Sequence, residues 1–199
     1  VAAMVRAVAH RGPDGSAWES NGRHAYGAAR LSITGDPSAP AYFRHPERDV
    51  VVLLNGEIYN VDSLRAGLLA GEPLLTDLET EVIARLYIRY GDDFVRRLEG
   101  MFAVALFDGD RLLLARDRMG IKPMYYASAG ESMAFGSEIK ALLELPGVSR
   151  DLDTQSLEEL CVFGYVCASD RTLLSSVRPV PPGSTVSLSH HGTKVSRYW

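Results

Sequence analysis

Asn55 and Gly56 directly follow an apolar run, Val50 to Leu54, and are residue types that could take part in chemistry. The run is β-branched and apolar on both faces, which is typical of a buried strand. At its end the chain could present a side-chain amide and a backbone N–H to a substrate. An Asn-Gly pair in this position is also a common turn signal. From these residues alone, both interpretations remain open.

The cysteines and histidines offer no clear chemistry of their own. Cys161 and Cys167 are too few for a disulfide framework or a metal site by themselves, and a free cysteine is commonly a small buried apolar residue. The five histidines lack the spacing of metal ligands. We therefore expect no metal in this domain.

Composition excludes several classes of function. The 199 residues are 46% hydrophobic, enough for one sizeable core, and 23% charged with a net charge of -4. Without a basic run, a partner held through nucleic-acid phosphates is not expected. The sequence has neither a signal peptide nor an apolar stretch of the roughly 20 residues that a membrane helix needs. We expect a cytoplasmic protein.

Helical spacing of apolar residues predicts the elements that would position these side chains. Helices are expected over residues 1–8, 61–70, 78–91, 139–145 and 154–166, with a short helical turn at 92–100. The strongest is 78–91, because Val82, Ile83 and Leu86 share a face and Gly91 follows as a stop. Asp62 is a plausible N-terminal cap for 61–70.

Apolar runs bounded by turn residues predict the strands. Residues 24–33 and 50–54 are joined by a proline-containing loop, and Asp108-Gly109-Asp110 between 101–107 and 111–117 is a strong hairpin signal. We expect 123–127 and 132–138 to continue that sheet, with 183–189 and 193–199 following later. Since 101–107 is apolar on both faces, the sheet should be covered on both sides, in a layered α+β sandwich.

Eight motifs in order give the chain a resemblance to class II glutamine amidotransferase domains, closest to the N-terminal part of glutamine-hydrolysing asparagine synthetases. The motifs are HRGPDG (10–15), ARLSI (29–33), LNGEIYN (54–60), ETEVI (79–83), LEGMFAVALFD (98–108), ARDRMGIKPMYY (115–126), GSEIKAL (136–142) and the closing PPG with RYW. The resemblance implies an N-terminal-nucleophile hydrolase fold, a four-layer α/β/β/α sandwich of two antiparallel sheets. In the family a first strand precedes the position of Val1.

The resemblance also implies a chemistry. In that family a cysteine at the mature N-terminus attacks the side-chain amide of glutamine, and its own α-amino group serves as the base. Ammonia leaves, and water resolves the thioester. Asn55 and Gly56 match the oxyanion hole of this reaction.

Other residues match the glutamine-binding segments of the family. Arg30 matches the arginine that binds the α-carboxylate, a group that suits a guanidinium fork. The adjoining backbone of Leu31, Ser32, Ile33 and Thr34 would line the same pocket, together with Glu57. Seen alone, Arg30 would be taken for a member of an ion pair and Glu57 for a surface carboxylate.

The stretch TDLETEV departs from the family pattern. Glu79 stands where the family usually has Asp to hold the substrate ammonium, and Leu78 precedes it. The longer side chain could change the fit to glutamine. Asp77 could take the charge role by a shift in register.

Arg11, Asp14, Arg116, Asp117 and Lys122 lie in strong family motifs, and we interpret them mainly as scaffold. Paired arginines and aspartates of this kind can fix the loops that position a site.

The nucleophile of the family has no counterpart in residues 1–199. Cys161 and Cys167 lie after the sandwich and carry no free α-amino group, so we expect neither to replace it. The chain as printed should not hydrolyse glutamine. A Cys-bearing segment upstream would make it a glutaminase; without one it would be a scaffold, a partner-binding module or an amino-acid sensor.

Partners and cofactors follow from the same resemblance. Residues 1–147 would form the sandwich core, and 148–199 its C-terminal part, leading to where a synthetase domain would follow. ATP and Mg²⁺ are expected only in that synthetase domain. The expected partners are glutamine and either a synthetase domain, a separate synthetase-like protein or a second copy of this chain.

Overall fold

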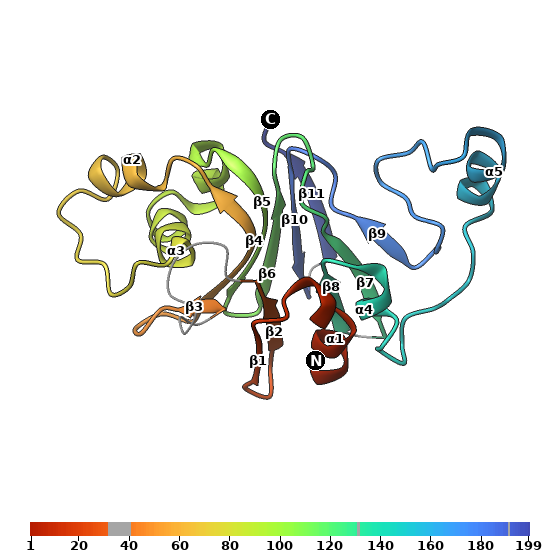
Figure 1. Ribbon diagram of the computed structural model, residues 1–199, viewed down its shortest axis with the longest axis horizontal. Coiled ribbons are helices and arrows are strands. Elements are labelled where there is room, and N and C mark those ends of the chain that lie inside the picture. The colour runs from red at the N-terminus through yellow and green to blue at the C-terminus, as the bar shows by residue number, and fades with distance from the viewer. Residues whose placement is uncertain (32–40, 131, 191) are drawn as a thin grey trace.

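Six antiparallel strands form the larger sheet, in the order β11-β10-β6-β5-β4-β3 (Figure 1). The computed structural model describes residues 1–31, 41–130, 132–190 and 192–199. The strands are β3 (Tyr42–Arg44), β4 (Val50–Ile58), β5 (Gly100–Asp108), β6 (Arg111–Arg116), β10 (Ser184–Ser189) and β11 (Gly192–Arg197). The predicted hairpin at residues 108–110 is confirmed, with Gly109 at φ +54° joining β5 to β6.

Strands β4 and β5 are buried on both faces over their apolar runs, as the sequence predicts. Even-numbered residues such as Val52 and Val104 belong to the core beneath the helices. Odd-numbered residues such as Leu53 and Ala105 belong to a second core on the opposite face. This alternation follows from the two-residue period of a strand.

A second β layer covers that opposite face. It contains a three-stranded sheet of order β8-β7-β9, built from β7 (Tyr125–Ala129), β8 (Ser132–Gly136) and β9 (Val177–Pro179). It also contains the hairpin of β1 (Gly15–Ser20) and β2 (Ala25–Arg30). The expectation that 123–127 and 132–138 continue the larger sheet is wrong, because β10 pairs with β6 and occupies that edge.

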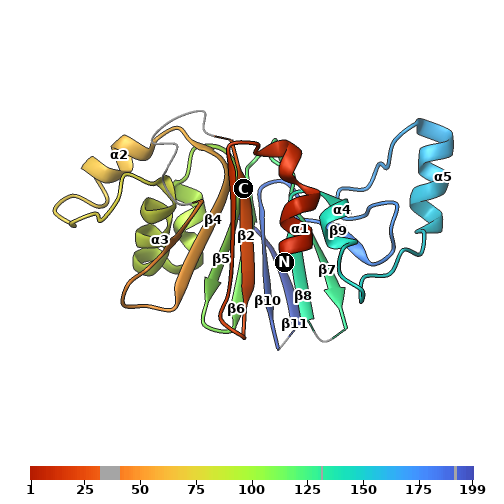
Figure 2. The ribbon, with the colours of Figure 1, turned by 60° about the horizontal axis from the view of Figure 1, so that its bottom comes forward.

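Helices cover both outer faces. On the larger sheet lie α2 (Val61–Ala66), α3 (Glu79–Tyr90) and the 3₁₀ segment η2 (Gly91–Arg97), as Figure 2 shows. On the smaller sheet lie α1 (Ala2–Ala7) and α4 (Ile139–Leu142), and the 3₁₀ turn η1 (Ala9–Arg11) follows α1. The predicted four-layer α/β/β/α sandwich is thus confirmed.

The last helix, α5 (Thr154–Phe163), stands away from both sheets in both views. Ser156 is its one buried residue, whereas Val162 and Phe163 are 73% and 59% exposed. No residue of α5 belongs to the three apolar cores of the described chain. Its exposed cysteine, Cys161, and the exposed Cys167 after it are therefore not the buried residues that we expected.

The predicted cap of α2 is also wrong. Asn60 is the N-cap, and no side chain caps the helix. The Asn60 side chain donates to Arg97 O at 2.9 Å and accepts from Glu99 N–H at 3.0 Å, so it ties the start of α2 to the end of η2. Asp62 lies two residues past the N-cap, inside the helix, and so is not the capping residue.

Candidate active site

Strand β4 continues through Asn55 and Gly56 to Ile58. Asn55 pairs with Ala103 and Gly56 with Phe102 in the β4–β5 ladder. The turn interpretation of the Asn-Gly pair is therefore wrong, and the pair belongs to the second half of a central strand.

Gly56 is required by the packing of this strand pair. It has φ +142°, and a Cβ at this position would lie 2.0 Å from Met101 O. Gly100 on the facing strand has φ +148° and would place a Cβ 2.2 Å from Glu57 O. Only glycine fits such an approach, so the local backbone geometry at Gly56 already explains its residue type.

The Asn55 side chain points to the start of α4. Its Nδ2 donates to Ser137 Oγ at 3.4 Å. The next residue, Glu138, contacts His10 Nε2 at 2.9 Å, Arg11 Nη1 at 3.1 Å and Lys140 Nζ at 3.0 Å. Burial opposes ionisation of Glu138, but the hydrogen bonds from Lys140, Arg11 and His10 outweigh it and lower its pKa. These contacts hold His10 and Arg11 against Glu138, the residue that follows the partner of Asn55.

Arg30 is the last residue of β2 and comes from the other β layer. The strand begins beside the β5–β6 turn, where His24 Nε2 lies 2.5 Å from Gly109 O and Tyr26 packs 5.5 Å from Phe107. From there β2 runs toward the end of the larger sheet at which Asn55 pairs (Figure 2). Arg30 is half-buried, and its carbonyl accepts from Asp14 N–H at 3.0 Å.

Glu79 closes the other side of β4. As the first residue of α3 it accepts the Ile58 N–H at 3.0 Å through Oε1. Burial raises the pKa of Glu79 above its ordinary value, the charge of Glu57 adds to the rise, and the Ile58 N–H opposes it. Asp77 is exposed, so Glu79 is the carboxylate that the structure places against β4.

Of the predicted binding residues that directly follow Arg30, only Leu31 is among the described residues. Leu31 is 52% exposed. Ser32, Ile33 and Thr34 fall outside the described residues.

Asp117 and Arg116 make contacts typical of scaffold residues. The Asp117 side chain, 1% exposed, accepts backbone N–H groups of Phe102, Met119, Ile121 and Lys122. Arg116 donates to the carbonyls of Gly120, Lys122 and Val180 instead of to a carboxylate, and burial lowers its pKa. Both residues stabilise the loop after β6, and Asp117 also fixes β5 opposite Gly56.

Sequence reasoning missed two residues near this site. Ser137 lies within the quoted motif GSEIKAL, but its contact with Asn55 joins positions 82 residues apart and leaves no local pattern. Glu81 lies within ETEVI, and it is completely buried although carboxylates are seldom found inside proteins. The family motifs GSEIKAL and ETEVI are the only sequence signals that could have indicated that Ser137 and Glu81 are important.

A separate groove of about 380 Å³ lies near the C-terminal segment. Arg116, Arg171 and Thr172 are among its lining residues, and none of the predicted site residues lines it. Within the described ranges, no three His, Cys, Asp or Glu residues gather to hold a metal ion. The described helices are also too short or too polar to cross a membrane.

The whole chain, residues 1–199, matches the glutamine amidotransferase domain family. The chain belongs to this family. Its match to asparagine synthetase [glutamine-hydrolyzing] 3 of Bacillus subtilis is 32% identical, covering 98% of this chain and 33% of the relative. Its match to asparagine synthetase [glutamine-hydrolyzing] 2 of rice is 40% identical, covering 70% of this chain and 24% of the relative. The amidotransferase domain thus spans about a third of the Bacillus relative's length.

A solved structure supports the fold. Glutamine phosphoribosylpyrophosphate amidotransferase from B. subtilis superposes with a TM-score of 0.68 at 18% identity, covering 98% of this chain and 45% of that one. The family match and the synthetase relatives make this a class II glutamine amidotransferase domain of the asparagine synthetase type, and the solved structure shows the N-terminal-nucleophile fold.

Proposed function

We propose that this domain binds glutamine and hydrolyses its side-chain amide to glutamate and ammonia. The observation that carries the proposal is the placement of Asn55, which lies in the second half of β4 with its amide against Ser137, next to the Glu138 that binds His10. The glutamine-hydrolysing relatives support the same reaction. Ammonia would pass to a synthetase-type domain that uses ATP and Mg²⁺, all within a cytoplasmic protein.

The proposed roles follow the positions of the side chains. Arg30 binds the α-carboxylate of glutamine with the help of the 31–34 backbone, and Glu57 and Glu79 face its ammonium group. Asn55 Nδ2 and the Gly56 N–H stabilise the oxyanion, as two donors aimed at the developing charge. The half-buried position of Glu79 strengthens its attraction for a cation.

The nucleophile in this proposal is a cysteine thiolate on a segment outside residues 1–199. It attacks the amide carbon of glutamine, ammonia leaves with the proton supplied by the α-ammonium group, and water then hydrolyses the thioester. The contacts of His10 and Arg11 with Glu138 support this arrangement, since they hold the N-terminal segment against the residue that follows Ser137.

A nucleophile-less binding domain is the second candidate function. It is favoured by Glu79, because its Oε1 already accepts the Ile58 N–H and this bond would compete with a substrate ammonium. Such a domain would bind a partner or an amino acid without releasing ammonia.

Glutamate release by the full-length protein, with its natural N-terminal segment, tests the first candidate. We expect Asn55→Ala to lower kcat by about 10²–10³, because one oxyanion donor is lost. Asn21→Ala is the matched control, since Asn21 lies in the β1–β2 turn and should leave kcat unchanged. Residues 1–199 alone should release no glutamate.

Three results would count against this proposal. Full activity in Asn55→Ala would refute the oxyanion assignment, and glutamate release by residues 1–199 alone would refute the external nucleophile. Glutamine binding by the full-length protein without any glutamate release would favour the second candidate.

A further inference from the structure

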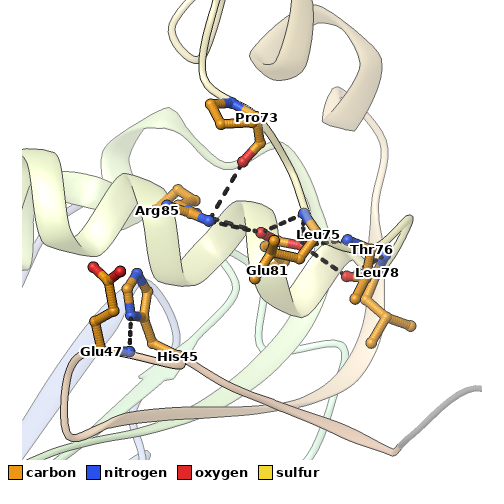
Figure 3. Close-up of polar contacts among 8 residues, drawn as sticks. All are labelled: His45, Glu47, Pro73, Leu75, Thr76, Leu78, Glu81 and Arg85. Atoms are coloured by element: carbon orange, nitrogen blue, oxygen red, sulfur yellow. Dashed lines mark hydrogen bonds and ion pairs between the residues drawn. The ribbon is translucent and has the colours of Figure 1, made fainter.

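Glu81 is a carboxylate buried in the first turn of α3, with 0% of the residue exposed. Its oxygens accept the Leu75 N–H at 3.0 Å, the Thr76 N–H at 2.7 Å and the Thr76 hydroxyl at 2.8 Å (Figure 3). Arg85 Nη2 lies 3.1 Å from Oε1. Burial opposes ionisation, but these hydrogen bonds outweigh it and lower the pKa of Glu81. The side chain is thus a fully partnered buried anion.

The groups that Glu81 binds belong to the segment leading into Glu79. Thr76 Oγ1 also accepts the Leu78 N–H at 3.3 Å, and the Glu81 N–H donates to Leu78 O at 3.2 Å. Leu75 and Thr76 therefore bind the carboxylate directly, and Leu78 is joined to it through the Thr76 hydroxyl and the Glu81 backbone, as Figure 3 shows. We call Glu81 and residues 75–78 the Glu81 clamp.

Outside the clamp, the segment has a further charged contact, because Arg65 Nη2 donates to Asp77 O at 2.6 Å. Leu78 is the N-cap of α3 and has no side-chain capping bond. Leu75 is 61% exposed, so apolar packing does not hold its side chain. Hydrogen bonds to a charged group are directional and stronger than neutral ones. Here the charged acceptor is the side chain of Glu81, inside the helix, whereas a helix start is usually fixed by the side chain of its N-cap residue.

We propose that Glu81 is a positioning residue, which fixes the Glu79 carboxylate through the clamp and thereby sets the affinity for glutamine. The inference rests on the proposed function, in which Glu79 faces the substrate ammonium. Glu79 Oε1 lies 3.0 Å from Ile58 N, so a small shift of residues 75–78 would move the carboxylate relative to β4. Displacements of about 1 Å can change enzyme kinetics substantially.

The test is Glu81→Gln in the full-length protein, with glutamine kinetics and calorimetric Kd as readouts. Glutamine keeps the size of the side chain but loses the charge and turns an NH₂ toward backbone donors. We expect KM and Kd to rise about tenfold while kcat stays within about twofold, because binding is weakened and not the chemical step. Glu158→Gln, at an exposed position on α5, is the matched control and should change neither.

A milder variant covers the case in which Glu81→Gln does not fold. Thr76→Val keeps the buried charge and the side-chain shape but removes the hydroxyl that joins Glu81 to Leu78. Thr76→Val should also raise KM, but by a smaller factor than Glu81→Gln.

A double-mutant cycle shows whether Glu81 acts through Glu79. In a Glu79→Gln background, Glu81→Gln should cause little further rise in KM, since the group that it positions is already gone. Fully additive effects would overturn the inference, as would a lowered melting temperature with unchanged KM.

The same cycle separates this inference from the proposed function. If Glu79→Gln weakens glutamine binding but Glu81→Gln and Thr76→Val do not, only the role of Glu81 is refuted. If the wild-type protein neither binds nor hydrolyses glutamine, both proposals are refuted.

Discussion

Glu79 and Glu81 stand two residues apart in the first turn of α3, yet their surroundings favour opposite protonation states. Burial and the charge of Glu57 raise the pKa of Glu79. Hydrogen bonds from Leu75, Thr76 and Arg85 outweigh burial at Glu81 and lower its pKa. One carboxylate is thus placed to gain a cation, whereas the other already has its partners.

This difference predicts a pH dependence of glutamine binding. Only ionised Glu79 attracts the substrate ammonium, so KM for glutamine should rise as the pH falls through the raised pKa, above the ordinary value of 4.5. Initial rates over a pH series measure this effect in the full-length protein. Glu79→Gln should show a high KM that stays constant over this pH range. If KM of that variant still rose at low pH as it does in the wild-type protein, the assignment would be contradicted.

The sequence could identify Glu79 but not the role of Glu81. Glu79 stands out because it replaces the aspartate expected from the family pattern. Glu81 looks like any solvated helix residue, since its burial depends on residues 75–78 folding back over it. A loop that folds back onto a helix produces no periodic pattern of apolar residues in the sequence.

At the scale of elements, the close approach of β4 and β5 explains why their glycines are needed. Gly56 and Gly100 both have positive φ, and a Cβ on either would lie 2.0 or 2.2 Å from a facing carbonyl oxygen, far inside van der Waals contact. The strands can therefore remain paired along the whole of β4, from Val50 to Ile58. The pairing sets the position of Asn55.

Gly56→Ala should accordingly destabilise the domain by about 3 kcal/mol or more, since backbone strain of about 1–3 kcal/mol is added to a steric overlap. Gly22→Ala is a matched control, because Gly22 has φ +84° with no atom within 4 Å of the added Cβ. We expect it to cost only about 1–2 kcal/mol, the strain alone. Urea unfolding measures both variants, and equal losses would argue against the overlap.

The elements themselves were largely predictable, but their ends were not. Apolar runs located β4, β5 and β6, and helical spacing located α3. The Asn-Gly pair looked like the end of β4 because turn propensity competes with pairing, and a glycine with φ +142° allowed pairing to continue.

At the scale of the molecule, the layer order was predictable and the division into sheets was not. Runs apolar on both faces indicated a covered sheet, and the resemblance implied two sheets. Nothing local to residues 123–138 indicates that the edge beside β6 is taken by β10, whose residues begin at Ser184. Pairings between distant segments leave no trace in local patterns.

The site depends on this stacking of layers. Arg30 comes from the β1–β2 hairpin, Asn55 from the larger sheet and Ser137 from the segment between β8 and α4. No single unit of the fold contains all three.

The isolation of α5 has a consequence for how the molecule moves. A helix of 10 residues is marginally stable without tertiary contacts, and α5 buries only Ser156 whereas α3 buries seven residues. In residues 1–199 alone, we expect backbone amides of α5 to exchange with deuterium at least about a hundredfold faster than those of α3. Mass spectrometry of exchanged peptides measures both helices in one sample, and equal protection would contradict the expectation. On this view, α5 unwinds and reforms many times while the stacked sheets stay closed.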